Sequence, residues 1–149
     1  MFFISLLCYV QPDVFVGKSI TNSIIDITKY RNSGLTDSLK QELKESLILQ
    51  LKEKKVYLNQ DLILIKLSDL VGSDRYSISQ IINQEFGKNY YEFVNDYRIE
   101  EAIQILTTKP DYTISDVIYL SGFNNRVSFN KAFKKRTGKT PSDYVAHIL

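Results

Sequence analysis

The feature that most constrains the fold is a sequence pattern that occurs twice. With an offset of 51 positions, residues 74–94 align with residues 125–145. Just upstream the offset is 50, so that Gly72 falls on Gly122. The difference of one residue lies in a turn, where an insertion costs little. Neither copy shows strand alternation or a two-residue hairpin turn. The pattern therefore predicts two copies of one helical unit.

Each copy is predicted to be a helix–turn–helix. A short helix at about 64–71 or 114–121 is followed by a glycine-containing turn and then by a second helix. Asp74 or Asn125 stands at the start of that second helix. Both are good N-cap residues, because their side-chain oxygens can accept hydrogen bonds from the free N–H groups of the first turn.

The second helix of each copy carries an apolar pair spaced four residues apart. The pairs are Ile78 with Ile82 and Phe129 with Phe133. Residues at this spacing share one helix face, and we expect both pairs to point into a core. In a helix–turn–helix of this kind, the second helix is presented to the major groove of DNA.

The opposite face of each second helix carries residue types that can contact base edges. These candidate DNA-binding residues are Arg75, Tyr76, Ser79, Gln80 and Asn83 in the first copy and Arg126, Val127, Asn130, Lys131 and Lys134 in the second. Asn and Gln can bind adenine with two hydrogen bonds, Arg and Lys can reach guanine O6 and N7, and Tyr76 and Val127 can contact thymine methyl groups. We expect Lys135, Arg136 and Lys139 to bind phosphates, which adds affinity without sequence choice.

Positive charge is concentrated in the second copy. Residues 122–149 contain six basic residues and one acidic residue in a chain whose net charge is only +2. The remaining 121 residues therefore carry a net charge of −3. A local basic surface on a nearly neutral chain indicates contact with a polyanion, and a solvated helix face is the alternative interpretation. The first copy is less basic and includes Glu85. We therefore expect the first copy to contribute more hydrogen bonds to bases and less electrostatic attraction to DNA.

A longer helical pattern at about 90–107 separates the two copies, and Pro110 lies just past its end. If this helix is rigid, the two recognition helices can enter successive major grooves on one face of the DNA, roughly 34 Å apart. Such a site needs no second copy of the chain, although the duplex has to bend where the spacing demands it.

An amphipathic helix is predicted ahead of the repeat, with Thr36 or Asp37 as its cap and Lys55 as its approximate end. Leucines recur in it every four residues, at positions 35, 39, 43, 47 and 51. This leucine face packs on its own domain in one interpretation and on a partner helix in the other, and the second allows a homodimer through residues 35–56.

Residues 1–34 are predicted to be an apolar or juxtamembrane segment with irregular structure. The first ten residues, MFFISLLCYV, are apolar and uncharged, yet too few to cross a bilayer, which needs about 20 in a helix. They form either a short buried element or the end of a membrane helix.

Catalytic and metal sites are not expected. The chain has one cysteine, Cys8, and one histidine, His147. It therefore lacks a disulfide within the chain, a metal-ligand cluster and a nucleophile–base set. No glycine-rich phosphate loop is present either. We expect a protein that is not an enzyme and that needs no cofactor.

Three stretches carry a resemblance to a known family. They are SISQIIN at 77–83, YEFVNDYRIEEAIQIL at 91–106 and TISDVIYLSGFNNRVSFNKAFKKRTGKTPSDY at 113–144. Residues 57–149 resemble the DNA-binding domain of bacterial AraC/XylS-type transcription regulators. The resemblance implies a reader of DNA with seven helices and two helix–turn–helix units, usually attached to a separate signal-sensing part. Two positions depart from the family's usual alanine: Ser68 is compatible, whereas the bulkier Ile118 is expected to change the docking angle of the second unit.

The resemblance also bears on the amino-terminal segment. The order of an apolar segment, residues 29–35 and an amphipathic helix is similar to the stretch after the last membrane helix of membrane-embedded regulators of this family. It implies one of two alternatives, the cytoplasmic output part of a longer protein tethered to the inner membrane or a truncated gene product. In both, the sensory portion is missing from this chain.

These inferences define one prediction. The fold is all-α, with two helix–turn–helix subdomains joined by a long linker helix and preceded by the amphipathic helix at 35–56. The function is sequence-specific binding of double-stranded DNA in transcription regulation, with RNA polymerase as a further expected partner. The alternative is a helical protein-interaction module that keeps the fold without specific DNA binding.

Overall fold

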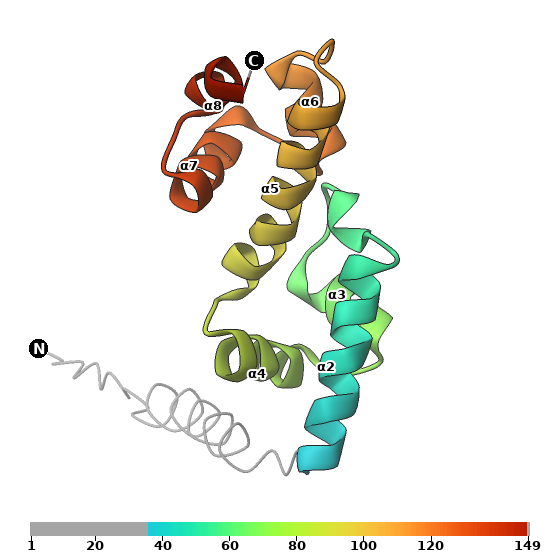
Figure 1. Ribbon diagram of the computed structural model, residues 1–149. Coiled ribbons are helices and arrows are strands. Elements are labelled where there is room, and N and C mark those ends of the chain that lie inside the picture. The colour runs from blue at the N-terminus through green and yellow to red at the C-terminus, as the bar shows by residue number, and fades with distance from the viewer. Residues whose placement is uncertain (1–35, 149) are drawn as a thin grey trace, which may run out of the picture. The chain divides into compact units, whose positions relative to one another are not determined.

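Residues 36–148 are described by a computed structural model, and side chains are described as far as His147. The part of the chain so described contains seven α-helices, one short 3-10 helix and no strand. In chain order they are α2 (Asp37–Lys52), the 3-10 helix η2 (Val56–Leu58), α3 (Leu64–Val71), α4 (Arg75–Phe86), α5 (Tyr90–Thr108), α6 (Ile114–Leu120), α7 (Arg126–Thr137) and α8 (Pro141–Ile148). The predicted all-α fold with two helix–turn–helix units is confirmed, as α3–α4 and α6–α7 (Figure 1).

The expectations for residues 1–34 lie outside the described residues. Among residues 36–148, no helix combines the length and the apolar character that crossing a membrane requires.

The first core is built by α2, η2, α3, α4 and the start of α5. Leu47 and Leu51 of α2 are fully buried, and Leu43 is 7% exposed, whereas Leu39 is 40% exposed. The leucine face of α2 therefore packs on its own domain, as the first interpretation predicted. Thr36 caps the helix by accepting a hydrogen bond from the backbone N–H of Leu39 (3.3 Å).

The second core is built by the end of α5 together with α6, α7 and α8. Its largest buried side chains are aromatic: Phe129 and Phe133 are fully buried, and Phe123 is 2% exposed. Ile118 is 3% exposed and packs into this core. In the first unit, Ser68 is buried in the first core, where its hydroxyl donates to the carbonyl oxygen of Leu64 (2.9 Å).

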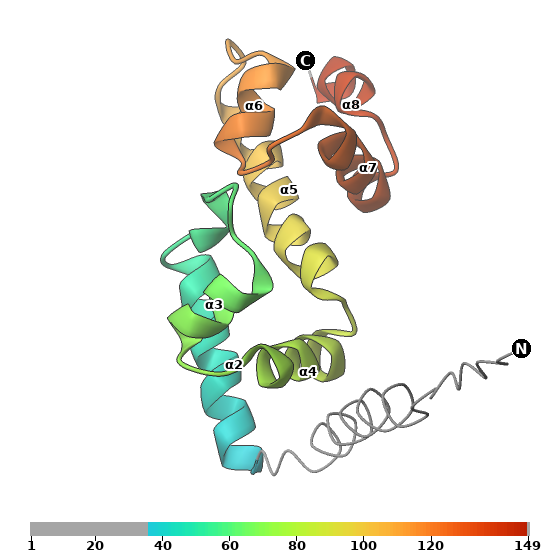
Figure 2. The same cartoon turned by 180° about the vertical axis from the view of Figure 1, so that it is seen from behind.

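Helix α5 is more than a spacer, because it contributes to both cores. Phe93 and Val94 near its start belong to the first core, and Ile99, Ala102 and Leu106 belong to the second. Figures 1 and 2 show the two units at the two ends of this helix. A capping box fixes where it begins, since the Asn89 side chain accepts from the N–H of Glu92 and Glu92 accepts from the N–H of Asn89.

A second connection joins the two units directly. Gly122 follows α6 with φ +89°, and a Cβ atom there would lie 2.4 Å from the carbonyl oxygen of Tyr57 and 2.9 Å from the Cα of Leu58. The guanidinium group of Arg98 donates to the same Tyr57 oxygen (2.8 Å) and to the carbonyl oxygen of Asn59 (3.0 Å). It also lies over the ring of Phe123, 5.7 Å from its centroid. The 3-10 helix η2 therefore packs closely on the turn of the second unit.

Candidate nucleic-acid interface

The start of α4 is fixed by its N-cap. The carboxylate of Asp74 accepts from the N–H groups of Tyr76 (2.9 Å) and Ser77 (3.1 Å), and also from the hydroxyl of Ser77 (2.6 Å). The Ser77 hydroxyl bond, helped by the backbone bonds, lowers the pKa of Asp74. The carboxylate is thus held ionised at the positive end of the helix dipole. This confirms the predicted cap.

The buried side of α4 agrees with the prediction and extends it. Ile78 and Ile82 are fully buried, and Ile81 is 1% exposed. The sequence interpretation missed Ile81, although it lies next to Ile82 and three positions after Ile78, on the flank of the same face.

The predicted groove face of α4 is the outward face. Tyr76 is 47% exposed, Arg75 and Asn83 are also exposed, and Ser79 and Gln80 are half-buried. The guanidinium of Arg75 lies over the Tyr76 ring, 4.6 Å from its centroid, and donates to the Tyr76 hydroxyl (2.5 Å). Two of the five predicted side chains therefore act as one stacked pair.

Glu85, which was expected to weaken the electrostatic attraction of α4 to DNA, binds a lysine of the same domain. Its carboxylate forms an ion pair with Lys44 of α2 (2.7 Å). The hydrogen bond from the Lys44 ammonium lowers the pKa of Glu85. Glu85 thus ties α4 to α2, and its negative charge is matched within the domain.

Helix α7 is capped and packed by the signature residues around it. The Asn125 side chain accepts from the N–H of Ser128 (2.8 Å). A chain of aromatic contacts then runs through the second core, with ring centroids 5.2 Å apart for Phe123–Phe129, 5.5 Å for Phe129–Phe133 and 5.4 Å for Phe133–Tyr144. Phe123 and Tyr144 are therefore the two ends of one chain of edge-to-face and tilted ring contacts.

The predicted DNA-contacting residues of α7 fall into two groups. Arg126, Val127, Asn130, Lys131 and Lys134 are exposed, Val127 to 79%. Within residues 36–147, no ion pair is formed by Arg126, Lys131 or Lys134. Lys135 and Arg136 belong to a second group, because α5 supplies a carboxylate to each.

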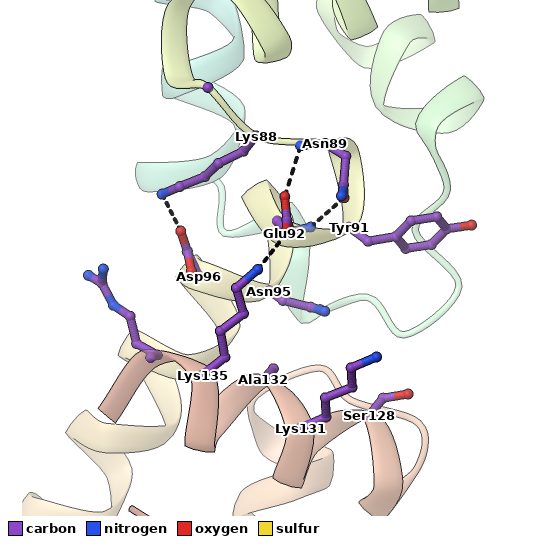
Figure 3. Close-up of a pocket in the computed structure, with 12 residues that line it drawn as sticks. Lys88, Asn89, Tyr91, Glu92, Asn95, Asp96, Ser128, Lys131, Ala132 and Lys135 are labelled. Atoms are coloured by element: carbon purple, nitrogen blue, oxygen red, sulfur yellow. Dashed lines mark hydrogen bonds and ion pairs between the residues drawn. The ribbon is translucent and has the colours of Figure 1, made fainter. Parts of the chain in front are cut away.

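Lys135 and Arg136 line an open groove of about 800 Å³ between α7 and the start of α5, together with Glu92 and Asp96 (Figure 3). Lys135 pairs with Glu92, and Arg136 pairs with Glu100 (2.8 Å). On the same helix, Asp96 pairs with Lys88 of the turn between α4 and α5. The hydrogen bond between Lys135 and Glu92 raises the pKa of Lys135 and lowers that of Glu92.

The sequence interpretation missed these carboxylates. Glu92, Asp96 and Glu100 recur every four residues, which places them on one face of α5. We call these three residues the acidic row. Their spacing was a readable signal, but only the packing of α7 against α5 identifies which cations they meet.

No candidate metal site of three or more His, Cys, Asp or Glu side chains occurs in the part of the chain that the structure describes.

Comparison with solved structures supports the architecture. The C-terminal domain of AraT, a response regulator from Geobacillus stearothermophilus, matches with a TM-score of 0.59 at 22% identity, covering 77% of this chain and 88% of that one. The DNA-binding domain of AdpA, a global transcriptional factor solved in complex with a target DNA, matches with a TM-score of 0.60 at 20% identity, covering 70% and 90%. At these identities the likeness concerns the fold.

Sequence relatives agree. An uncharacterized HTH-type transcriptional regulator of Staphylococcus aureus (strain COL) is 34% identical over 89 residues, which are 60% of this chain and 12% of the relative. The ornithine utilization regulator of Pseudomonas aeruginosa is 41% identical over 58 residues, covering 39% of this chain and 17% of that protein. The chain thus matches only a small part of the length of these relatives.

A family model described as "Helix-turn-helix domain" matches residues 67–147, more than half of the chain. That span begins within α3 and ends within α8, so it covers most of the first unit, the helix that joins the units and the second unit. The chain therefore belongs to the helix-turn-helix family, in its AraC type, a family of DNA-binding transcription regulators rather than of enzymes.

Proposed function

We propose that this chain binds specific sequences of double-stranded DNA by placing α4 and α7 in successive major grooves. One observation carries the proposal: two N-capped helices expose faces rich in base-reading side chains, and a single helix that belongs to both cores holds them. The AdpA domain with the same fold was solved with a target DNA, which supports the proposal further.

The proposed contacts fall into two kinds. Exposed polar and apolar side chains of the two helices read base edges: Arg75, Tyr76, Ser79, Gln80 and Asn83 of α4, and Arg126, Val127, Asn130, Lys131 and Lys134 of α7. Phosphate contacts were predicted for Lys135, Arg136 and Lys139, and all three remain proposals. Those of Lys135 and Arg136 have to account for the carboxylates already bound to them.

Selection of bound duplexes from a random pool at defined salt tests the proposal. We expect two readable blocks whose centres lie about one helical turn, 10–10.5 base pairs, apart. A single block, or no enrichment over the starting pool, would contradict the two-groove arrangement.

Single substitutions in α7 test the base-reading face. Asn130→Ala and Lys131→Ala are each expected to relax base preference in one block by about 1–3 kcal/mol per lost contact. Lys54→Ala is the matched control, because Lys54 is an exposed cation outside both recognition helices. An unchanged preference profile for both α7 variants would refute the assignment of this face.

Salt dependence separates DNA binding from the alternative of a protein-interaction module. Binding through several phosphates weakens steeply as salt rises, with a slope of about −0.9 per neutralised phosphate. Docking of an apolar partner helix is far less sensitive to salt. If the affinity for the natural ligand did not change with salt, the protein-interaction module would be favoured over DNA binding.

We propose in addition that the chain acts in the cytoplasm, as the DNA-binding part of a longer regulator that also contacts RNA polymerase. The small share of each relative that the chain matches supports a larger whole. A homodimer through residues 35–56 would have to use the outer face of α2, where Leu39 and Leu49 are exposed, because the buried leucines are already in the first core.

A further inference from the structure

The Glu92–Lys135 and Glu100–Arg136 ion pairs lie at the surface, outside both hydrophobic cores. Glu92, with 38% of its side chain exposed, and Glu100, with 57% exposed, lie at the surface of α5. Lys135 and Arg136, their partners, are 70% and 45% exposed. Ion pairs this exposed contribute little to stability, because water and salt screen them. Their position on a DNA-binding domain therefore needs another account.

The Lys135–Glu92 and Arg136–Glu100 pairs lie beside the predicted DNA-contacting face of α7. Lys135 lies one helical turn after Lys131, so both project from the same face of α7 into the open groove. Figure 3 shows the Lys135 side chain turned towards Glu92, whereas no interaction is drawn for Lys131. Two of the six basic residues in 122–149 are thus directed towards α5 carboxylates.

From this geometry we infer that Glu92 and Glu100 withhold Lys135 and Arg136 from DNA phosphates, and so limit the sequence-independent part of DNA binding. Each carboxylate competes with phosphate for the same cation. A cation that is already neutralised releases little counterion when DNA arrives, and counterion release drives binding to DNA of arbitrary sequence. Base preference then depends more on the other predicted DNA-contacting residues of α4 and α7. The inference rests on the proposed function.

The structure offers a substitution that changes charge while keeping the local fold. Glu92 is also the capping-box residue of α5, and its Oε2 accepts from the N–H of Asn89 (3.2 Å). Glutamine serves in the same position of a capping box. Glu92→Gln should therefore leave the start of α5 intact and remove only the negative charge that holds Lys135.

The test is the salt dependence of binding to a labelled duplex of random sequence, followed by fluorescence anisotropy. Compared with the unmodified chain, Glu92→Gln with Glu100→Gln should bind more tightly at low salt. The slope of log K against log salt should steepen by about 0.9 for each cation released, so by about 1.8 for the pair. The double variant Glu42→Gln with Glu53→Gln is the control, because it gains the same net charge from exposed carboxylates for which no ion pair occurs in residues 36–147.

A third variant identifies the cations responsible. Adding Lys135→Ala and Arg136→Ala to the Glu92→Gln, Glu100→Gln background should return the slope to that of the unmodified chain. An unchanged slope in the glutamine variant, or an equal change in the control, would overturn the inference, since the effect would then be absent or due to net charge alone.

A second readout keeps failure of the proposed function distinguishable. If the unmodified chain binds no duplex, sequence-specific DNA binding is wrong, and the competition is measured on a heparin column instead. The glutamine variant should then elute at higher salt than the control variant. Elution of both at the same salt would refute the withholding of Lys135 and Arg136 by α5, whatever the natural ligand.

Discussion

Replacing Gly122 by alanine tests whether the two helix–turn–helix units touch as closely as described. Gly122 has φ +89°, and the added Cβ would lie 2.4 Å from the Tyr57 carbonyl oxygen, far inside ordinary contact. Because that oxygen also accepts from Arg98 (2.8 Å), it cannot move away without disturbing the hydrogen bond. The substitution therefore opposes both the local backbone and the contact between units.

The expected magnitude has two parts. Left-handed backbone costs an alanine roughly 1–2 kcal/mol, and forcing an extra carbon into a filled site costs typically about 1–3 kcal/mol. The free energy of unfolding should fall by about 2–5 kcal/mol, a large share of the 5–15 kcal/mol typical of a domain.

The repeat supplies the control. Gly72 occupies the equivalent position of the first unit with φ +81°, but an added Cβ there meets nothing within 4 Å. Gly72→Ala should show only the backbone part, about 1–2 kcal/mol. Urea unfolding followed by circular dichroism measures both variants. Equal losses of stability in the two would refute the close approach of the units at Gly122.

Two further predictions concern stability. Phe133→Ala should lower the free energy of unfolding by about 3–5 kcal/mol, because the lost ring contacts Phe129 and Tyr144 inside a fully buried site, and unchanged thermal unfolding would contradict the core assignment. The pKa of Glu85 is lowered by the hydrogen bond from Lys44. Because the folded-state pKa lies below the usual 4.5, this pair stabilises the fold above that pH and loses its effect as the pH falls through the lowered value. Urea midpoints measured at neutral and acidic pH should therefore differ less in Glu85→Gln than in the unmodified chain, and an equal difference would contradict the ion pair.

Most of the fold was readable from the sequence because its signals are local. Caps such as Asp74 and Asn125 and apolar pairs such as Phe129 with Phe133 act within a few residues, so spacing alone identifies them. Because the pattern occurs twice, each cap and each apolar pair was found at two positions of the chain. The predicted helices at 64–71 and 90–107 agree with α3 and α5 to within a residue.

What the sequence did not show depends on contacts between distant segments. Lys135 and Glu92 are 43 positions apart, and Arg98 reaches Tyr57 across 41. No periodicity encodes such pairs, since they arise only once helices have docked. This is why Lys135 and Arg136 were interpreted as phosphate ligands, while their partners on α5 went unnoticed. The base-reading roles of the other residues of α4 and α7 stay predictions, because they concern a ligand rather than the fold.

Because α5 belongs to both cores, it limits how far the distance between the two DNA blocks of an operator can vary. A reader with a loose hinge can adapt when a base pair is inserted between its two target blocks. Here each block would be bound by a recognition helix that packs on α5. The Gly122–Tyr57 contact would resist rotation of one helix–turn–helix unit relative to the other. An inserted base pair rotates one block by about 34° relative to the other. The duplex would have to absorb that rotation by twisting or bending, so the stiffness of the intervening bases would become part of the recognition code.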